Sequence, residues 1–334
     1  MKSARELTVE LFQKTVPSMS YDGGDVLIWQ EKARKKLAEL LGMDKIKKCG
    51  LDLHIEYTAK IENATEIRFT YQSEEGYRVP CHLVLPDGVK KPPVIITLQG
   101  HSKGMHVSLN RTVYPGEDNT ELIKGDRDFA VRALREGFAA VTLEMRDFGE
   151  CGGSANGPQC FEESMSALLL GRTAVGERVF DIMRLIDVLE SDFSDLTDTG
   201  CICLMGNSGG GTATAYTAAL EKRLFLAMPS CAISSYKASI GGMNHCACNY
   251  IPHIAEYFDM GDLICMAAPV AYIQVNGVSD PIFPIEPAKE MFAQGKRAYE
   301  ALGIPDKAVH IIGSEGHRFY ADASWPFVHK LTGR

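Results

Sequence analysis

The spacing of apolar and polar positions divides the chain into regions of different periodicity. Residues 3–14 and 25–42 are predicted to be helices, the second with Asp25 as its N-cap and Gly42 as its end. From Leu51 onward the pattern changes to the alternation of β-strands. We therefore expect an N-terminal helical extension, residues 1–50, ahead of a second region spanning residues 51–334.

Three strands are expected at the start of that second region, at residues 51–55, 67–71 and 77–85. The segments between them are too short to contain crossover helices. Parallel neighbours require such crossovers, so these three strands should pair antiparallel.

Beyond Pro93, apolar runs alternate with helical segments. The expected strands lie near residues 94–98, 138–144, 201–205, 224–228, 270–275 and 309–312, and the expected helices near 126–136, 173–190, 208–220, 286–302 and 324–331. This order predicts an α/β fold with a mostly parallel sheet and helices on both faces. Insertions at about 145–171 and 229–269 interrupt the alternation, and connections of that length are typical of functional loops or lids.

Composition and charge narrow the class of protein. The 334 residues are 45% hydrophobic and 23% charged, as in ordinary soluble globular proteins. The net charge of -8 is spread along the chain, which argues against a nucleic-acid partner. Residues 1–30 lack the pattern of a secretory signal, and no apolar run has the length of a membrane span. We expect a cytoplasmic protein with no membrane partner.

The cysteines and histidines are candidate metal ligands, and the cysteines are also candidate disulfide partners. The ten cysteines are scattered, and Cys201 and Cys203 fall in an apparent buried strand, so reduced thiols are expected. His101, His106 and Asp118 lack a compact ligand spacing. The segment at residues 245–248 has two cysteines but no second pair at zinc-finger spacing, which favours packing or a pocket wall. We therefore predict no metal and no cofactor.

The segment Gly206-Asn207-Ser208-Gly209-Gly210 lies between an apolar run and a stretch of small, helix-compatible residues. A nucleophile elbow has this order, because its serine occupies a strained turn between strand and helix and the glycines leave room for close backbone packing. An ordinary glycine-rich turn also fits the pentapeptide. A phosphate-binding loop fits less well, because no lysine follows the glycines at the required spacing. The context favours Ser208 as a nucleophile.

A serine nucleophile needs a general base to accept its proton. Of the nine histidines, His317 follows the last expected strand in a loop containing glycine. His310 and His329 fall within a strand and a helix, where packing or surface roles fit better. We predict His317 as the base.

The base in turn needs a carboxylate to fix its tautomer. Asp280 follows the strand expected at 270–275, although an aspartate before Pro281 also suits a turn. Ser208, Asp280 and His317 then follow three different strands in the order that a nucleophile elbow fold requires. We predict that they form a catalytic triad.

Acyl transfer also needs donors for the oxyanion. The amide of Gly209 directly follows the nucleophile, and the amide of His101 lies in the loop after the strand at 94–98. These two are the predicted oxyanion-hole donors. We further assign four residues to substrate binding: Gly100, Asn207, Arg146 and His245.

Several of these motifs together resemble a known group of enzymes. Residues 80–86, 98–101, 206–210, 280–284 and 316–317 look like the α/β hydrolases related to dienelactone hydrolase and to acetyl xylan esterase or cephalosporin C deacetylase. The resemblance extends from about residue 50 to the C-terminus. The run that begins at Arg146 also matches an Arg-x-x-Gly loop of such enzymes, and residues 245–252 resemble a stretch of bacterial members of the group.

The resemblance implies an α/β-hydrolase fold and hydrolysis of a small-molecule ester through an acyl-enzyme, and small acyl groups, such as acetate on a sugar or another small acetyl ester, are expected. The chain departs from the pattern at two points. It has Gln99-Gly100-His101 where many esterases have His-Gly, and its nucleophile is serine where dienelactone hydrolase uses cysteine.

Two other functions remain open at this point. An amidase or peptidase can use the same triad, and a binding protein can keep the fold without catalysis. The helical extension can either pack on the second region or join copies of the chain into a homo-oligomer.

Overall fold

The computed structural model describes all residues, 1–334. Its strands are β1 (His54–Ile61), β2 (Ala64–Glu74), β3 (Tyr77–Pro86), β4 (Pro93–Leu98), β5 (Ala139–Leu143), β6 (Asp198–Asn207), β7 (Leu226–Ser230), β8 (Ala271–Gly277) and β9 (Ala308–Gly313). Its α-helices are α1 (Ala4–Lys14), α2 (Val26–Leu40), α3 (Asn119–Leu122), α4 (Phe129–Arg135), α5 (Cys160–Leu169), α6 (Ala174–Asp192), α7 (Gly209–Leu220), α8 (Ile254–Tyr257), α9 (Met260–Ala267), α10 (Ile285–Ala301) and α11 (Ala321–Thr332).

The strands form one nine-stranded sheet in the order β1-β2-β3-β5-β4-β6-β7-β8-β9. β1, β2 and β3 pair antiparallel, as the sequence predicts, and β3 is also antiparallel to β5. From β5 to β9 all neighbours are parallel. The predicted fold class is therefore confirmed, and the carboxyl ends of the parallel strands lie along one edge.

Each face of the sheet packs against its own hydrophobic core. Neighbouring residues of β4 divide between the cores, because strand side chains alternate: Ile96 enters the larger one and Ile95 the smaller. α2, α6, α7, α9 and α10 supply side chains to the larger core, and α4 and α11 supply them to the smaller. Burial on both faces explains why these strands are nearly all apolar.

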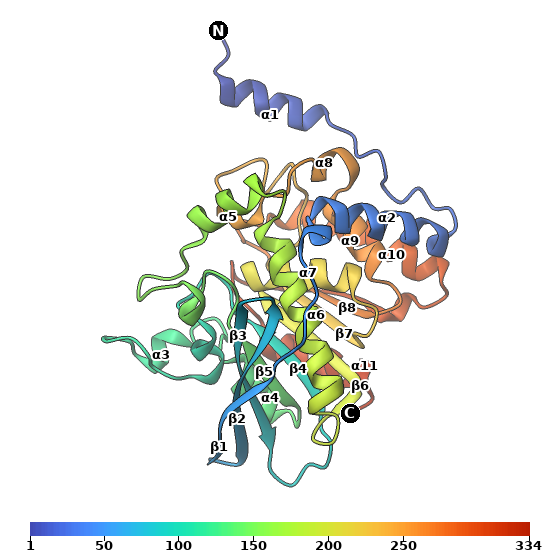
Figure 1. Ribbon diagram of the computed structural model, residues 1–334. Coiled ribbons are helices and arrows are strands. Elements are labelled where there is room, and N and C mark those ends of the chain that lie inside the picture. Colours follow the sequence, from blue (N-terminus) through green and yellow to red (C-terminus); the bar gives the residue numbers. More distant parts are fainter.

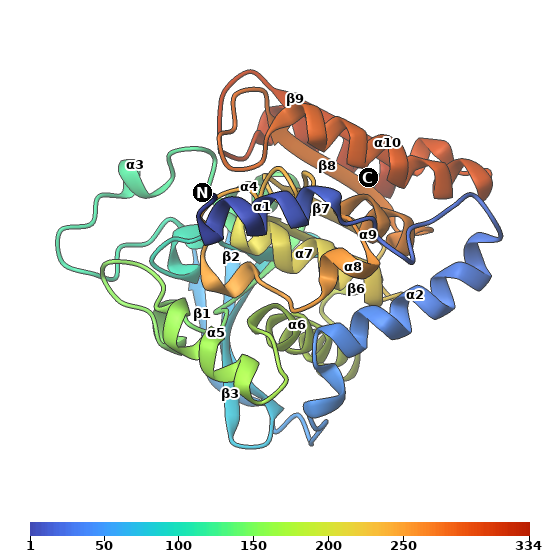
Figure 2. The ribbon, with the colours of Figure 1, turned by 90° about the horizontal axis from the view of Figure 1, so that it is seen from above.

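The N-terminal extension consists of two helices with different environments. Leu37 and Leu41, in and after α2, are fully buried in the larger core, and Gln30 donates hydrogen bonds to the carbonyls of Cys265 and Ala268. By contrast α1 buries no residue, and it projects from the body of the molecule (Figure 1). Seen from above, it lies in front of the body of the molecule (Figure 2), and Thr8, Leu11 and Phe12 line one cavity with residues of α8 and of the segment before it.

Both predicted insertions contain helices that periodicity did not reveal. α5 occupies the first, and α8 and α9 occupy the second. α9 is buried along its whole length, so it lacks the polar face that marks an amphipathic helix in a sequence.

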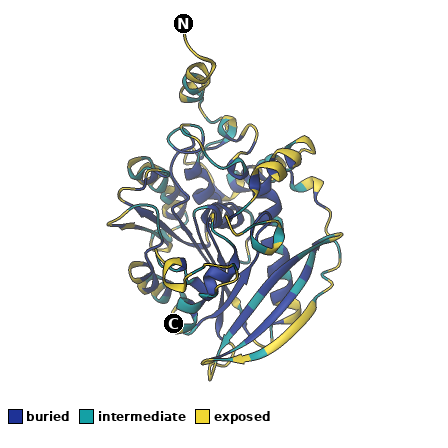
Figure 3. Ribbon diagram, turned by 90° about the vertical axis from the view of Figure 1, so that its left-hand side faces the viewer, coloured by how far each residue is buried: buried dark blue, intermediate teal, exposed yellow.

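Strand β1 is the exposed edge of the sheet (Figure 3). It begins at His54 rather than near residue 51. None of the helices combines the length and the apolar character needed to cross a bilayer. All ten cysteines are free thiols.

Candidate active site

Ser208 lies at the turn between β6 and α7. Its backbone has φ 54° and ψ -118°, a strained conformation for a residue with a side chain. The amide of Ser208 donates to the carbonyl of Ser230 at 2.8 Å, which ties the turn to the end of β7. Strand, strained serine and helix are thus arranged as a nucleophile elbow requires.

Glycines allow the backbone segments around the elbow to approach closely. A Cβ on Gly210 would lie 2.4 Å from the carbonyl oxygen of Leu98, at the end of β4. A Cβ on Gly100 would lie 3.1 Å from the Cβ of Ser208. Any side chain at either position would push the helix or the loop after β4 away from the serine.

His317 and Asp280 form a hydrogen-bonded pair. His317 lies in the loop after β9, and its Nδ1 is 2.8 Å from Oδ2 of Asp280, in the loop after β8. The Phe283 ring stacks on the imidazole, with centroids 6.0 Å apart. This pairing leaves Nε2 of His317 as the ring nitrogen available for a proton from a nucleophile.

The environment of Asp280 favours its charged form. Burial alone would raise the pKa of this carboxyl. The hydrogen bond and charge of His317, together with the amides of Ile282 and Phe283, lower the pKa by more than burial raises it. Those two amides donate to Oδ1 at 2.8 and 3.1 Å. The net effect is a pKa below the ordinary value, so the residue is a carboxylate at neutral pH.

Ser208 and His317 line the same cavity, which has a volume of about 560 Å³. The two side chains make no hydrogen bond to each other in this structure, and catalytic hydrogen bonds often tighten only when substrate is bound. The cavity is lined by Gly100, His101, Ser102, Lys124, Gly125, Arg127, Asn207, Ser208, Gly209, Asn244, His245, Cys246, Asn249, Ile282, Phe283, His317 and Arg318.

The amides predicted to hold an oxyanion are both at this cavity. Gly209 is the first residue of α7, where the first-turn N–H groups have no acceptor within the helix. The His101 amide donates to no backbone carbonyl. The His101 ring packs against Gly209 so closely that a Cβ there would lie 2.8 Å from the ring.

Three of the four predicted substrate-binding residues, Gly100, Asn207 and His245, line the cavity, and Arg146 does not. Arg146 is buried, donates from Nε and Nη2 to the two oxygens of Asp181 at 2.9 Å, and covers the ring of Tyr77 at 4.1 Å. Its guanidinium is fully engaged in joining β3 to α6. The matched Arg-x-x-Gly loop therefore points its arginine into the protein rather than into the cavity.

Other residues of the site were not predicted from sequence. Lys124 and Arg127 lie in the segment before α4 and line the cavity. Arg318 directly follows the base. For Arg318 the sequence has one weak signal, its position next to His317. For Lys124 and Arg127 the sequence has no signal.

His106 and Asp118, which the sequence offers as metal ligands together with His101, have other partners in the structure. His106 Nε2 lies 3.2 Å from Glu117, and Asp118 caps α3. His101 instead lies beside Cys160, Cys246 and Cys248. His245 and Cys246 form part of the cavity wall, which is one of the two roles that the sequence predicts for the segment at 245–248.

The order of the strands and the elbow at the end of β6 define the α/β-hydrolase fold. Among solved structures, a protein of Bacteroides fragilis assigned as an acetyl xylan esterase has a TM-score of 0.82 at 15% identity, with 99% of this chain and 95% of that chain covered. A glucuronoyl esterase from Solibacter usitatus has a TM-score of 0.69 at 16% identity, covering 96% and 98%. Acetyl xylan esterase 1 from Thermoanaerobacterium has a TM-score of 0.57 at 14% identity, covering 96% and 98%.

Sequence comparison also gives a relative. YtaP of Bacillus subtilis, which is assigned as a hydrolase, is 23% identical over 72% of this chain and 78% of its own length. No family model matches the chain.

Proposed function

We propose that this protein is a serine hydrolase that cleaves carboxylic esters through an acyl-enzyme. The observation that carries the proposal is the convergence of three elements at one cavity: the strained Ser208 after β6, and the His317–Asp280 pair from the loops after β9 and β8. The resemblance in fold to esterases of carbohydrates supports the same reaction class.

The reaction that this geometry supports begins with attack of Ser208 Oγ on the ester carbonyl, while Nε2 of His317 takes the hydroxyl proton. The amides of Gly209 and His101 stabilise the oxyanion of the tetrahedral intermediate. The intermediate collapses as His317 returns the proton to the departing alcohol, which leaves an acyl-enzyme. Water, deprotonated by His317, then attacks the acyl group, and the acid leaves as Ser208 regains its proton.

The cavity lining indicates the substrate class. Only a few of its residues are apolar, among them Ile282 and Phe283, whereas amides, imidazoles and cationic side chains make up much of the wall. Such a surface suits a polar alcohol such as a sugar better than a long acyl chain. We infer a small acyl ester, such as an acetate, on a carbohydrate or another polar small molecule.

Replacement of the nucleophile tests the proposal directly. In Ser208→Ala, turnover of p-nitrophenyl acetate should fall by roughly 10⁴-fold or more, because the attacking oxygen is gone. A fluorophosphonate should add one adduct to the wild type and none to the variant, as measured by intact mass. Ser191→Ala, at an exposed position, is the matched control.

Wild-type turnover by Ser208→Ala would exclude the proposed nucleophile. Acetylated oligosaccharides, short-chain acyl esters and peptides compared on the wild type then test the substrate class. Preferential cleavage of peptides would identify an amidase or peptidase instead.

A further inference from the structure

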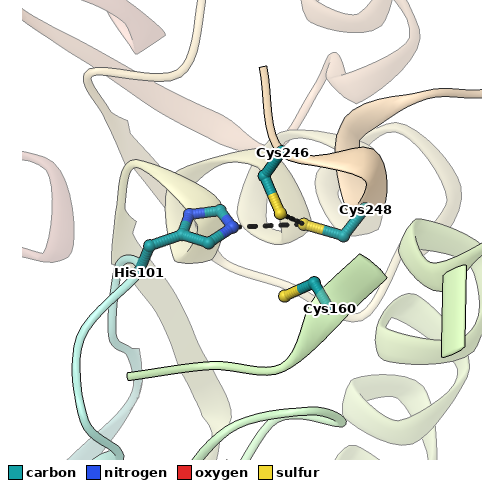
Figure 4. Close-up of side chains that lie close together, drawn as sticks. All are labelled: His101, Cys160, Cys246 and Cys248. Carbon is teal, nitrogen blue, oxygen red and sulfur yellow. Dashed lines mark hydrogen bonds between the residues drawn. The ribbon is translucent and has the colours of Figure 1, made fainter. Parts of the chain in front are cut away.

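Four potential metal ligands converge beside the cavity from three separate segments (Figure 4). His101 lies in the loop after β4, Cys160 begins α5, and Cys246 and Cys248 lie in the long segment between β7 and α8. Their ligand atoms, one imidazole nitrogen and three sulfurs, all lie within 4.8 Å of one another. In the picture all four side chains point toward one common space.

The spacing of these atoms fits one small ion at their centre. Zinc binds thiolate sulfur at about 2.3 Å and imidazole nitrogen at about 2.0–2.1 Å, so tetrahedral geometry places two ligating sulfurs roughly 3.8 Å apart and a sulfur and a nitrogen roughly 3.5 Å apart. The Cys246 and Cys248 sulfurs are 3.4 Å apart, and Nε2 of His101 is 3.2 Å from the sulfur of Cys248. Each distance is a few tenths of an ångström shorter than the separation expected around zinc.

We propose that His101, Cys160, Cys246 and Cys248 bind a single zinc ion through one nitrogen and three sulfurs. Three thiols and an imidazole are the donor set of structural zinc sites, which are four-coordinate and closed to substrate. Thiolate donors also disfavour magnesium and calcium, which prefer oxygen ligands.

The surroundings of the cluster complement the charge of such a site. Zinc with three thiolates and a neutral imidazole carries a net charge of -1. Arg178, which is buried, donates from Nη2 to the Cys160 sulfur at 3.4 Å and to Asp147 at 3.0 Å. A hydrogen-bonded cation next to a ligating sulfur is the kind of outer partner that holds metal ligands in place.

The position of the cluster gives the ion a structural task. It would cross-link the loop after β4 to both long insertions, 145–171 and 229–269. His101 carries one of the two amides assigned to the oxyanion, so fixing its ring fixes the loop that positions this donor. The positioning of the His101 amide rests on the proposed esterase activity, whereas the metal site itself does not.

Metal content measures the site without reference to activity. The full-length protein, purified from zinc-supplemented medium without chelators, should contain about one zinc per chain by inductively coupled plasma mass spectrometry. Cys160→Ser and Cys248→Ser should lose most of it. Cys201→Ser, which changes another buried cysteine, should keep it.

Cobalt substitution reports the ligands even if the variants fold poorly. The wild type reconstituted with Co²⁺ should show thiolate-to-cobalt charge transfer and the intense visible bands of a tetrahedral site. A metal-free wild type, a Cys246–Cys248 disulfide found by peptide mapping, or cobalt bands that persist in Cys160→Ser would each overturn the proposal.

The catalytic consequence is measured separately. Removal of zinc by a chelator should slow fluorophosphonate labelling of Ser208 by about tenfold or more, since complete loss of one oxyanion donor costs roughly 10²- to 10³-fold. Unchanged labelling after complete zinc removal would refute the role of the ion in positioning the oxyanion donor. It would not change the conclusion that the four residues bind zinc, which depends on the metal content. Absence of labelling in the zinc-loaded wild type would refute the proposed function alone.

Discussion

The two oxygens of Asp280 have separate tasks in the site. Oδ1 accepts the amides of Ile282 and Phe283 and so holds the turn after β8, whereas Oδ2 faces Nδ1 of His317. The same residue thus caps a turn and orients the base. The two sequence interpretations of Asp280 are both compatible with its position.

This division of tasks leads to a prediction for Asp280→Asn. Asparagine can keep the turn with its carbonyl oxygen but presents an NH₂ group to Nδ1, which favours the wrong imidazole tautomer. The turnover of p-nitrophenyl acetate should fall by roughly 10³- to 10⁴-fold. Enzyme assays and thermal melts of the variant should therefore show lost activity with a largely retained fold.

Asp195→Asn, at a fully exposed aspartate, provides the comparison variant. Activity of Asp280→Asn within tenfold of the wild type would mean that His317 does not depend on this carboxylate.

At the level of single residues, sequence could predict what depends on position relative to strand ends. Ser208, Asp280 and His317 each follow a strand, and chain order assigns their roles. The role of Arg146 could not be predicted in this way. The motif places Arg146 in a loop, but the direction of its side chain depends on Asp181, which lies 35 residues away on α6. The same holds for Cys160, because no local pattern connects it to Cys246 and Cys248.

At the level of elements, the end of β5 joins two loops near the site through Glu144. This carboxyl is buried, and the amide of Met105 donates to its two oxygens at 3.0 and 3.2 Å. A Cβ on Gly149 would lie 2.0 Å from one of them, so the second loop packs directly on the carboxyl. Burial raises the pKa of Glu144 to about 8, and the charge of Glu150 adds to the effect against the opposing backbone amides.

The raised pKa predicts a specific pH dependence of stability. The folded state keeps a proton on Glu144 up to about pH 8, whereas the unfolded chain loses it near the ordinary value of 4.5. The contribution of Glu144 to the free energy of unfolding is therefore greatest below that ordinary value and falls as the pH rises toward 8. In Glu144→Gln this decline should be absent.

Melting temperatures of both proteins between pH 5 and 8 measure the effect. The advantage of Glu144→Gln over the wild type should grow with pH by roughly 2 °C or more across this interval. Glu75→Gln, at an exposed turn, should follow the wild type. Parallel pH profiles for the wild type and Glu144→Gln would contradict a protonated Glu144.

Periodicity located elements well where one face is polar or where the strand is wholly apolar. The parallel strands β4 and β6, for example, are buried on both faces and therefore form apolar runs that stand out from their neighbours. α9 was not predicted because all of its residues are buried, so its sequence has no polar face. α5 was not predicted because it lies within the long connection at about 145–171, and a connection of that length is typical of a loop.

At the scale of the whole molecule, α1 and α2 connect differently to the rest. The segment between them is anchored at Asp262 in α9, which accepts the amide of Tyr21 at 2.9 Å and the hydroxyl of Ser20 at 2.8 Å. α2 beyond this point completes the larger core. α1 before it touches the body through partly exposed contacts, such as Lys237 Nζ to the Gln13 carbonyl at 3.1 Å.

We predict that a chain lacking residues 1–15 folds and keeps the proposed esterase activity, because α1 contributes no buried residue. Its melting temperature should stay within about 2 °C of the full-length protein, a difference of about 1.4 kcal/mol or less for a chain of this length. Removal of residues 1–50 should instead prevent folding, since Leu37 and Leu41 belong to the larger core and their loss would expose its apolar side chains to water. Light scattering on the full-length and shortened chains separates the two roles considered for the extension. A smaller particle after removal of α1, beyond the mass of the deleted residues, would mean that α1 joins copies of the chain through its exposed Leu7 and Leu11. A loss of 10 °C or more on its removal would show that α1 belongs to the folded core, contrary to the prediction.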